Sequence, residues 1–309
     1  MRNKLTMFIF ISSVLLFSKG VSLAQNLEEF KRGKNDFVEQ STRELDKAKA
    51  SKIKTRLRYA GFFDVAGKVP QEKTLVEKLT FDKNGKRKEL TRYIRSEMID
   101  LRYIFKYDAK GRILKMETRN AENIAVGRRE SKYDRAGNEI ERKLFDKKRG
   151  DMRVVFTYDK ENNLIESKSY DKNKKMFGRY VNVFENGSAK TTTVYGKDGS
   201  VQKEITFVYD EAGKLIREDF KELSGSYSVD YLYDKNGNIA EIKTPQTKRV
   251  VNYNDAHDIL EDKMFTADGA RQYRVAFSYL ENGLQNDEIR YDNSEKAAFH
   301  AQFKYEFYK

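Results

Sequence analysis

The chain has 309 residues, a formal net charge of +13 and no cysteine, and 35% of its residues are charged. The lack of cysteine excludes disulfides, thiolate metal sites and attachment of a lipid to an N-terminal cysteine. Hydrophobic residues make up 39% of the chain, aromatic residues make up 13%, and the mean hydropathy is -0.82. We therefore expect a thin layer of aromatic side chains rather than a thick globular core.

Residues 1–24 are typical of an export signal. Two basic residues precede an apolar run from Leu5 to Phe17, and small residues surround Ala24. The apolar run of about 13 residues is shorter than the roughly 20 that a membrane helix needs. We expect an exported protein that is cleaved after Ala24 and resides at the cell surface, in the outer membrane or in the periplasm.

Residues 25–58 have a different character. They are rich in Glu, Lys and Ala, they contain no turn motif, and Leu27, Phe30, Phe37 and Leu45 recur at loosely helical spacing. This pattern predicts a helical N-terminal segment of one or two helices, which caps the first strand of the following domain.

Residues 59–309 contain a short repeat, in which an aromatic-x-aromatic pair is followed by Asp and then by Gly. The second aromatic positions are Phe81, Tyr107, Tyr133, Tyr158, Phe184, Tyr209, Tyr233, Tyr253, Tyr279 and Tyr305. A weaker set of aromatic residues lies about halfway between them, so the unit has 12 to 13 residues. Self-similarity at a fixed period indicates a repeat architecture. Residues two apart share one face of a strand, so each unit predicts a strand, a turn and a strand.

The Asp and Gly of each unit are predicted to shape a turn. Asp at the first position of a type I turn caps backbone N–H groups, and Gly takes the left-handed position that follows. His257 occupies the Gly position of its own unit, and His tolerates left-handed backbone better than most residues. The clearest pairs are Asp108 and Gly111, Asp134 and Gly137, Asp210 and Gly213, and Asp234 and Gly237.

Calcium binding is the alternative role for these Asp residues, because the stretch from Asp234 to Asn238 superficially resembles a calcium loop. An EF-hand loop has Gly at its sixth position and Glu at its twelfth, whereas Gly237 is fourth here. His300 has no acidic or thiol partner at a recognised ligand spacing, so a joint catalytic or metal role for His257 and His300 is not favoured. The turn role is favoured, and we expect neither a metal nor a cofactor.

The repeat resembles the YD repeats of the RHS family, whose signature is an aromatic residue followed by Tyr-Asp-x-x-Gly-x-Leu. The matching units are Phe105, Tyr107, Asp108, Gly111 and Ile113; Phe207, Tyr209, Asp210, Gly213 and Leu215; and Tyr231, Tyr233, Asp234, Gly237 and Ile239. Degenerate copies extend the resemblance to about residues 79–309. The resemblance implies an exported, strand-rich sheet that wraps on itself and is often associated with surface contact or toxin delivery.

Two departures limit what the resemblance implies. The large family members enclose a cargo in a shell built from far more repeats. They also release a C-terminal toxin through a core motif that contains Asp-Pro, whereas the only prolines here are Pro70 and Pro245, and neither follows Asp. The toxin function is therefore not expected.

The predicted fold is mainly β, with tandem antiparallel hairpins that form a wrapped or curled sheet. About 18 strands exceed what an open sheet holds without curling. An outer-membrane β-barrel is an alternative, since even strand spacing is typical of exported barrels. Charged residues occupy both faces of the stretch 215–220, with Arg217 on one face and Glu218 on the other. A lipid-facing Arg costs about 2 to 4 kcal/mol, so a soluble sheet is favoured.

We do not expect an enzyme, because no nucleophile motif, phosphate loop or metal motif occurs. In an up-and-down sheet alternate turns lie at the same end, and the turns opposite the Tyr-Asp turns carry excess positive charge. This basic rim is predicted to bind anions, and a solvated rim that only maintains solubility is the alternative. The rim residues are Arg128, Arg129, Lys147, Lys148, Arg149, Lys172, Lys174 and Lys175.

The sequence thus favours a surface-associated repeat protein that mediates adhesion to an extracellular macromolecule. The expected partner is an acidic polysaccharide or a host matrix protein, with peripheral association at the outer membrane and no nucleic acid. A periplasmic or envelope scaffold is the second interpretation.

Overall fold

The computed structural model describes residues 37–63, 72–95, 98–147 and 150–309. The predicted signal segment therefore lies outside the described residues. The chain divides into two compact units, Met1–Glu44 and Leu45–Lys309. The helix α2 runs over Phe37–Ala50, which confirms a short helical segment near the N-terminus. Among the described residues, no helix is both long and apolar enough to cross a membrane.

The second unit contains a sheet of 20 described strands, whereas about 18 were expected from the sequence. The first begins at Ile53, so the boundary expected at residue 59 is too late. The strands are β1 (Ile53–Phe62), β2 (Thr74–Phe81), β3 (Arg87–Arg95), β4 (Met98–Tyr107), β5 (Ile113–Arg119), β6 (Ala125–Tyr133), β7 (Glu139–Asp146), β8 (Met152–Tyr158), β9 (Leu164–Asp171), β10 (Met176–Glu185), β11 (Ser188–Tyr195), β12 (Val201–Tyr209), β13 (Leu215–Glu222), β14 (Gly225–Tyr233), β15 (Ile239–Lys243), β16 (Thr247–Tyr253), β17 (Ile259–Thr266), β18 (Arg271–Tyr279), β19 (Gln285–Tyr291) and β20 (Ala297–Phe307).

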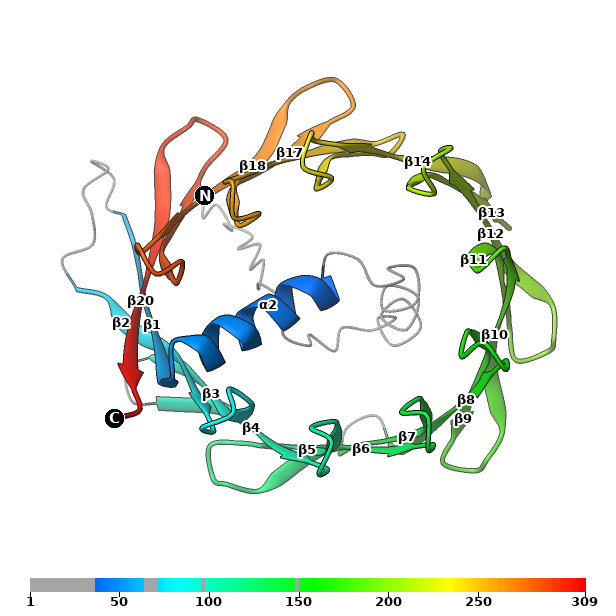
Figure 1. Ribbon diagram of the computed structural model, residues 1–309, viewed down its shortest axis with the longest axis horizontal. Coiled ribbons are helices and arrows are strands. Elements are labelled where there is room, and N and C mark those ends of the chain that lie inside the picture. Colours follow the sequence, from blue (N-terminus) through cyan, green and yellow to red (C-terminus); the bar gives the residue numbers. More distant parts are fainter. Residues whose placement is uncertain (1–36, 64–71, 96–97, 148–149) are drawn as a thin grey trace, which may run out of the picture. The chain divides into compact units, whose positions relative to one another are not determined.

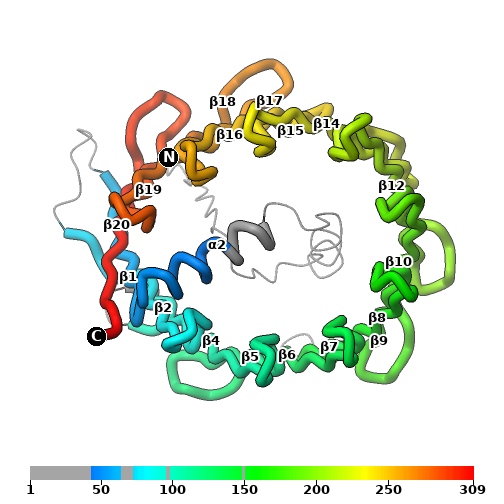
Figure 2. Tube along the Cα trace, viewed as in Figure 1, coloured from blue at the N-terminus to red at the C-terminus, as the bar shows by residue number. Residues whose placement is uncertain are grey.

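The sheet closes on itself. Every strand pairs antiparallel with the next strand along the chain, and β20 pairs antiparallel with β1. In Figures 1 and 2 the strands accordingly follow one another in chain order around the closed sheet. Closure leaves none of the 20 described strands with an unpaired edge. The mainly β fold of tandem antiparallel hairpins is confirmed.

One face of the sheet holds the core. Its buried hydrophobic side chains are Leu79, Phe81, Leu90, Tyr103, Met116, Val154, Phe156, Tyr180, Val194, Ile205, Phe207, Phe220, Val251, Ala301 and Phe303. Successive side chains of a strand point to opposite faces. Side chains converge on the concave face of a closed sheet and diverge on the convex face, so we assign the buried set to the concave face. The core is therefore a thin layer, as the composition predicts.

The second aromatic residue of the repeat joins neighbouring hairpins. The hydroxyl of Tyr233 donates a hydrogen bond of 2.6 Å to the carbonyl oxygen of Leu215, the first residue of the return strand in the preceding hairpin. The same bond links Tyr133 to Ile113, Tyr158 to Glu139, Tyr209 to Ala189, Tyr253 to Ile239, Tyr279 to Ile259 and Tyr305 to Gln285. This recurring bond explains why most units have Tyr rather than Phe at this position.

Replacing Tyr233 by Phe should lower the free energy of unfolding by about 0.5 to 1.5 kcal/mol, because one hydrogen bond between hairpins is lost. Tyr291→Phe is the control, since the Tyr291 hydroxyl has no hydrogen-bond partner among the described residues. Urea unfolding measures both changes. Equal losses in the two variants would show that the hydroxyl contact does not stabilise the sheet.

Candidate functional site

The Tyr-Asp turns are built around their Asp side chains. In the turn between β12 and β13, Asp210 Oδ1 accepts a hydrogen bond of 2.8 Å from the backbone N–H of Lys214. The N–H of Gly213 bonds the carbonyl of Asp210, and Gly213 has a φ of 76°. His257 has a φ of 62° in the corresponding position. The described residues include no group of three or more His, Asp or Glu placed to hold a metal ion.

Cations connect one Tyr-Asp turn to the next. The guanidinium of Arg112, which follows Gly111, lies 4.4 Å from the centre of the Tyr133 ring. Lys86 lies over Tyr107 and Lys214 lies over Tyr233 in the same manner, at 5.7 and 5.3 Å. These cation–π contacts stabilise the packing of adjacent hairpins against each other. At this end of the sheet these three cations thus have a structural role.

The C-terminal part of α2 supplies one more contact of this kind, near the strands where the sheet closes. Asp258 stands in the position that holds a cation in the units just described, and Lys47 of α2 supplies the missing ammonium. Lys47 Nζ lies 2.6 Å from Asp258 Oδ1 and 2.8 Å from the carbonyl oxygen of Gly283. It also lies 5.5 Å from the centre of the Tyr279 ring. The sequence analysis did not identify Lys47, because its contacts are more than 200 residues distant along the chain.

The predicted basic rim lies at the opposite end of the sheet. Lys147 is exposed in the turn between β7 and β8, and Lys148 and Arg149 of that turn lie outside the described residues. Lys172, Lys174 and Lys175 are all exposed in the turn between β9 and β10. We call Lys147, Lys172, Lys174 and Lys175 the lysine cluster. None of the four has an ion-pair partner among the described residues.

The turn between β9 and β10 is formed by backbone and Asp contacts. Asp171 Oδ1 accepts hydrogen bonds of 2.9 Å from the backbone N–H groups of Asn173 and Lys175. Lys174 has a φ of 63°, a conformation in which Gly or Asn costs less. The lysine side chains are therefore not needed to form the turn.

Arg128 and Arg129 lie within β6 rather than in a turn. Arg128 is half-exposed and pairs with Glu130 at 3.2 Å. Arg129 lies on the concave face and pairs with Glu139 at 3.3 Å. The expectation that both residues adjoin the exposed rim is therefore wrong for Arg129, because the alternation along β6 turns its side chain to the other face.

Arg142 and Glu139 form a buried ion pair on the concave face. Arg142 Nε lies 3.1 Å from Glu139 Oε1, and a terminal guanidinium nitrogen lies 2.5 Å from Oε2. Burial alone would raise the pKa of Glu139, but the hydrogen bond from Arg142 and the charges of Arg142 and Arg129 lower it. This cluster is structural, because its polar groups bond one another.

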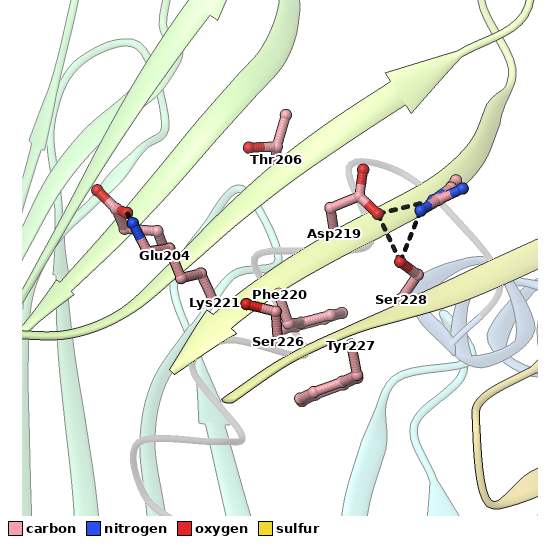
Figure 3. Close-up of a pocket in the computed structure, with 9 residues that line it drawn as sticks. Glu204, Thr206, Asp219, Phe220, Lys221, Ser226, Tyr227 and Ser228 are labelled. Carbon is pink, nitrogen blue, oxygen red and sulfur yellow. Dashed lines mark hydrogen bonds and ion pairs between the residues drawn. The ribbon is translucent and has the colours of Figure 1, made fainter. Parts of the chain in front are cut away.

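A surface hollow of about 370 Å³ lies over β12, β13 and β14. Figure 3 shows Asp219 and Ser228 on one side of these strands and the rings of Phe220 and Tyr227 on the other. Ser228 Oγ donates to Asp219 Oδ1 at 2.6 Å, and Arg217 bonds both residues. The hollow is open, and Arg217, Asp219 and Ser228 within it already bond one another, so the lysine cluster is the stronger candidate site.

Residues 63–253 match the family model described as Teneurin YD-shell. This match covers more than half of the chain, so the chain belongs to the Teneurin YD-shell family, and the predicted kinship with YD-repeat proteins is confirmed. No curated protein matches the sequence.

Three solved structures are similar to parts of the chain. The TcdB2-TccC3-Cdc42 complex matches 75% of this chain with 12% identity and a TM-score of 0.31, and this chain spans 14% of the matched chain. A porin-like protein from Bacteroides uniformis matches 83% of this chain and 97% of its own length, with 10% identity and a TM-score of 0.36. One from Bacteroides vulgatus matches 66% of this chain and 94% of its own length, with 15% identity and a TM-score of 0.34.

Proposed function

We propose that this chain is an exported, surface-associated binding protein that contacts an acidic extracellular macromolecule through the lysine cluster. The observation that carries the proposal is the concentration of three exposed lysines in one turn, beside Lys147 in the next turn at the same end. Turns two strands apart are about 10 Å apart, so the four charges act together on a polyanion at physiological salt, where the Debye length is about 8 Å.

We expect the closely spaced charges of the lysine cluster to lower the stability of the fold. Lys172, Lys174 and Lys175 repel one another within a single turn, and Lys174 adopts the left-handed conformation in place of Gly or Asn. Sites that depart from local rules in this way are often functional. A partner with closely spaced negative charges would offset the repulsion, and acidic polysaccharides and acidic host matrix proteins have such charges.

Replacing the four lysines of the cluster by Ser should abolish binding to heparin, which serves as a soluble polyanionic probe. Binding of the unmodified chain should weaken steeply as salt is raised, because the attraction is between exposed charges. Isothermal titration calorimetry at two salt concentrations measures both effects. The melting temperature should change little, since exposed turn residues contribute little to the core.

The control removes the same amount of charge from the other end of the sheet. Lys110, Arg135, Lys160 and Lys235 are exposed in Tyr-Asp turns, and their replacement by Ser should leave most of the heparin binding intact. Equal losses in the two variants would mean that net charge alone attracts the polyanion. The lysine cluster would then be only a solvated surface.

A further inference from the structure

Exposed hydrophobic side chains occur at the same end of the sheet as the lysine cluster. Leu223, in the turn between β13 and β14, is 81% exposed, and Ile94, at the end of β3, is 63% exposed. The other exposed members at this end are Phe62 at the end of β1, Met98 at the start of β4, Ile124 between β5 and β6, Phe145 at the end of β7, and Val201 at the start of β12. Single exposed hydrophobic residues are common on protein surfaces, so their distribution decides whether they matter.

Phe62 packs against the ring of Phe299 of β20, and the other side chains of this set lie in one arc of the sheet end. The turns between β15 and β16, between β17 and β18, and between β19 and β20 contain no exposed Leu, Ile, Val, Met or Phe, and all three are among the described residues. The turn between β15 and β16 lies between Lys243 and Lys248, and the other two turns carry Asp268, Asp292 and Glu295 together with Arg271 and Lys296. The arc from β3 to β14 is thus apolar and basic, whereas the arc from β15 to β20 is polar, with charges of both signs.

The lysine cluster lies in the middle of the apolar arc. Met98 and Ile124 precede it along the sheet, Phe145 lies beside Lys147, and Val201 and Leu223 follow it. Same-end turns are about 10 Å apart, so hydrophobic tips flank the charges on both sides. Lys197, exposed in the turn between β11 and β12, adds a cation next to Val201.

We propose that the apolar, basic arc of turns from β3 to β14 docks on an anionic lipid surface. This inference rests on the proposed function, because it identifies the acidic partner of the lysine cluster as negatively charged groups presented at the surface of a lipid layer. Exposed aliphatic and aromatic tips enter the boundary between headgroups and acyl chains, while lysines remain at the level of the anionic headgroups. The polar arc from β15 to β20 has no exposed hydrophobic tip to insert and would lie outside the contact.

A soluble acidic polysaccharide fits the arc less well. It satisfies the lysines but offers no apolar environment for Leu223, Ile94 or Ile124, which would remain in water on binding. A lipid layer satisfies both kinds of side chain at once. The two ligands therefore respond differently when the hydrophobic tips are changed and the lysines are kept.

The test measures sedimentation of the purified chain with vesicles of phosphatidylcholine and of phosphatidylcholine mixed with phosphatidylglycerol. We expect binding to the anionic vesicles and little to the neutral ones. The Ile124→Ser, Leu223→Ser double variant should bind anionic vesicles at least about tenfold more weakly, with unchanged heparin binding. The control is the Leu114→Ser, Ile216→Ser variant, which removes exposed aliphatic residues near the Tyr-Asp turns and should bind vesicles normally.

Each outcome of the vesicle and heparin experiments supports or overturns one of the two proposals. Equal vesicle binding by the two double variants would overturn the lipid proposal, as would heparin binding without any vesicle binding. Both of those results leave the proposed function standing, because the lysine cluster would still bind a polyanion. Failure to bind either vesicles or heparin would overturn the proposed function itself. Circular dichroism and melting temperature confirm that the variants fold like the unmodified chain.

Discussion

Replacing Arg142 by Met should lower the free energy of unfolding by about 3 kcal/mol, because it leaves the Glu139 carboxylate on the concave face without its main partner. The side chains of Arg142 and Glu139 are only 11% and 14% exposed. Arg129 remains near Glu139 at 3.3 Å, and it offsets only part of the loss. Urea unfolding at neutral pH measures the change.

Arg153→Met is the matched control, because Arg153 also pairs with a glutamate of β7. Arg153 is 50% exposed and lies 2.6 Å from Glu141 on the convex face, where Lys132 also reaches Glu141 at 3.0 Å. Glu141 is 12% exposed, but it keeps Lys132 as a partner, and Arg153 itself lies half in water. The expected loss is therefore about 0 to 1 kcal/mol. A loss as large as that of Arg142→Met would contradict the distinction between the two faces.

The effect of Arg142→Met should depend on pH in a defined direction. The pKa of Glu139 is lowered in the folded chain, so its ionised form contributes stability above the unfolded value of about 4.3. That contribution is lost as the pH falls through the lower folded pKa. The difference in unfolding free energy between the unmodified chain and the variant should therefore shrink below about pH 4. A constant difference would show that Arg142 acts by packing alone.

Replacing Gly85 by Ala should destabilise the chain by about 2 to 5 kcal/mol, through a left-handed backbone and a steric clash together. Gly85 has a φ of 78°, and an added Cβ would lie 2.7 Å from Lys49 Cβ and 3.0 Å from the carbonyl oxygen of Leu45. The last turn of α2 would have to move away from the turn between β2 and β3. Urea unfolding measures the loss.

Gly213→Ala is the control that measures the cost of the left-handed backbone conformation alone. Gly213 has a φ of 76°, but nothing lies within 4 Å of its added Cβ, so the expected loss is only about 1 to 2 kcal/mol. The difference between the two variants isolates the contact with the helix end. If both variants lose the same stability, the helix end does not pack against the turn.

The turn chemistry could be predicted from sequence because it is local. Asp210 and Gly213 act within one turn, through bonds that span four residues or fewer, and the same residue types recur in other units. The exposed position of Lys172, Lys174 and Lys175 followed from the same reasoning, since residues at a turn tip between two strands lie in water. Arg129 was misplaced because the turn between β5 and β6 ends at Ile124, earlier than the charge pattern suggested.

The repeat, the hairpins, the thin aromatic core and the end of the sheet at which the lysines gather are all legible in the sequence, because they depend on alternation and on short-range bonds. Closure of the sheet, with β1 beside β20, became known only from the three-dimensional fold, since pairing between strands so distant in sequence leaves no periodic signal. The fold also shows that Lys47 pairs with Asp258, and that Leu223 and Ile124 lie on one arc with the lysine cluster. These contacts arise from closure, which brings residues together by position around the sheet rather than by spacing along the chain.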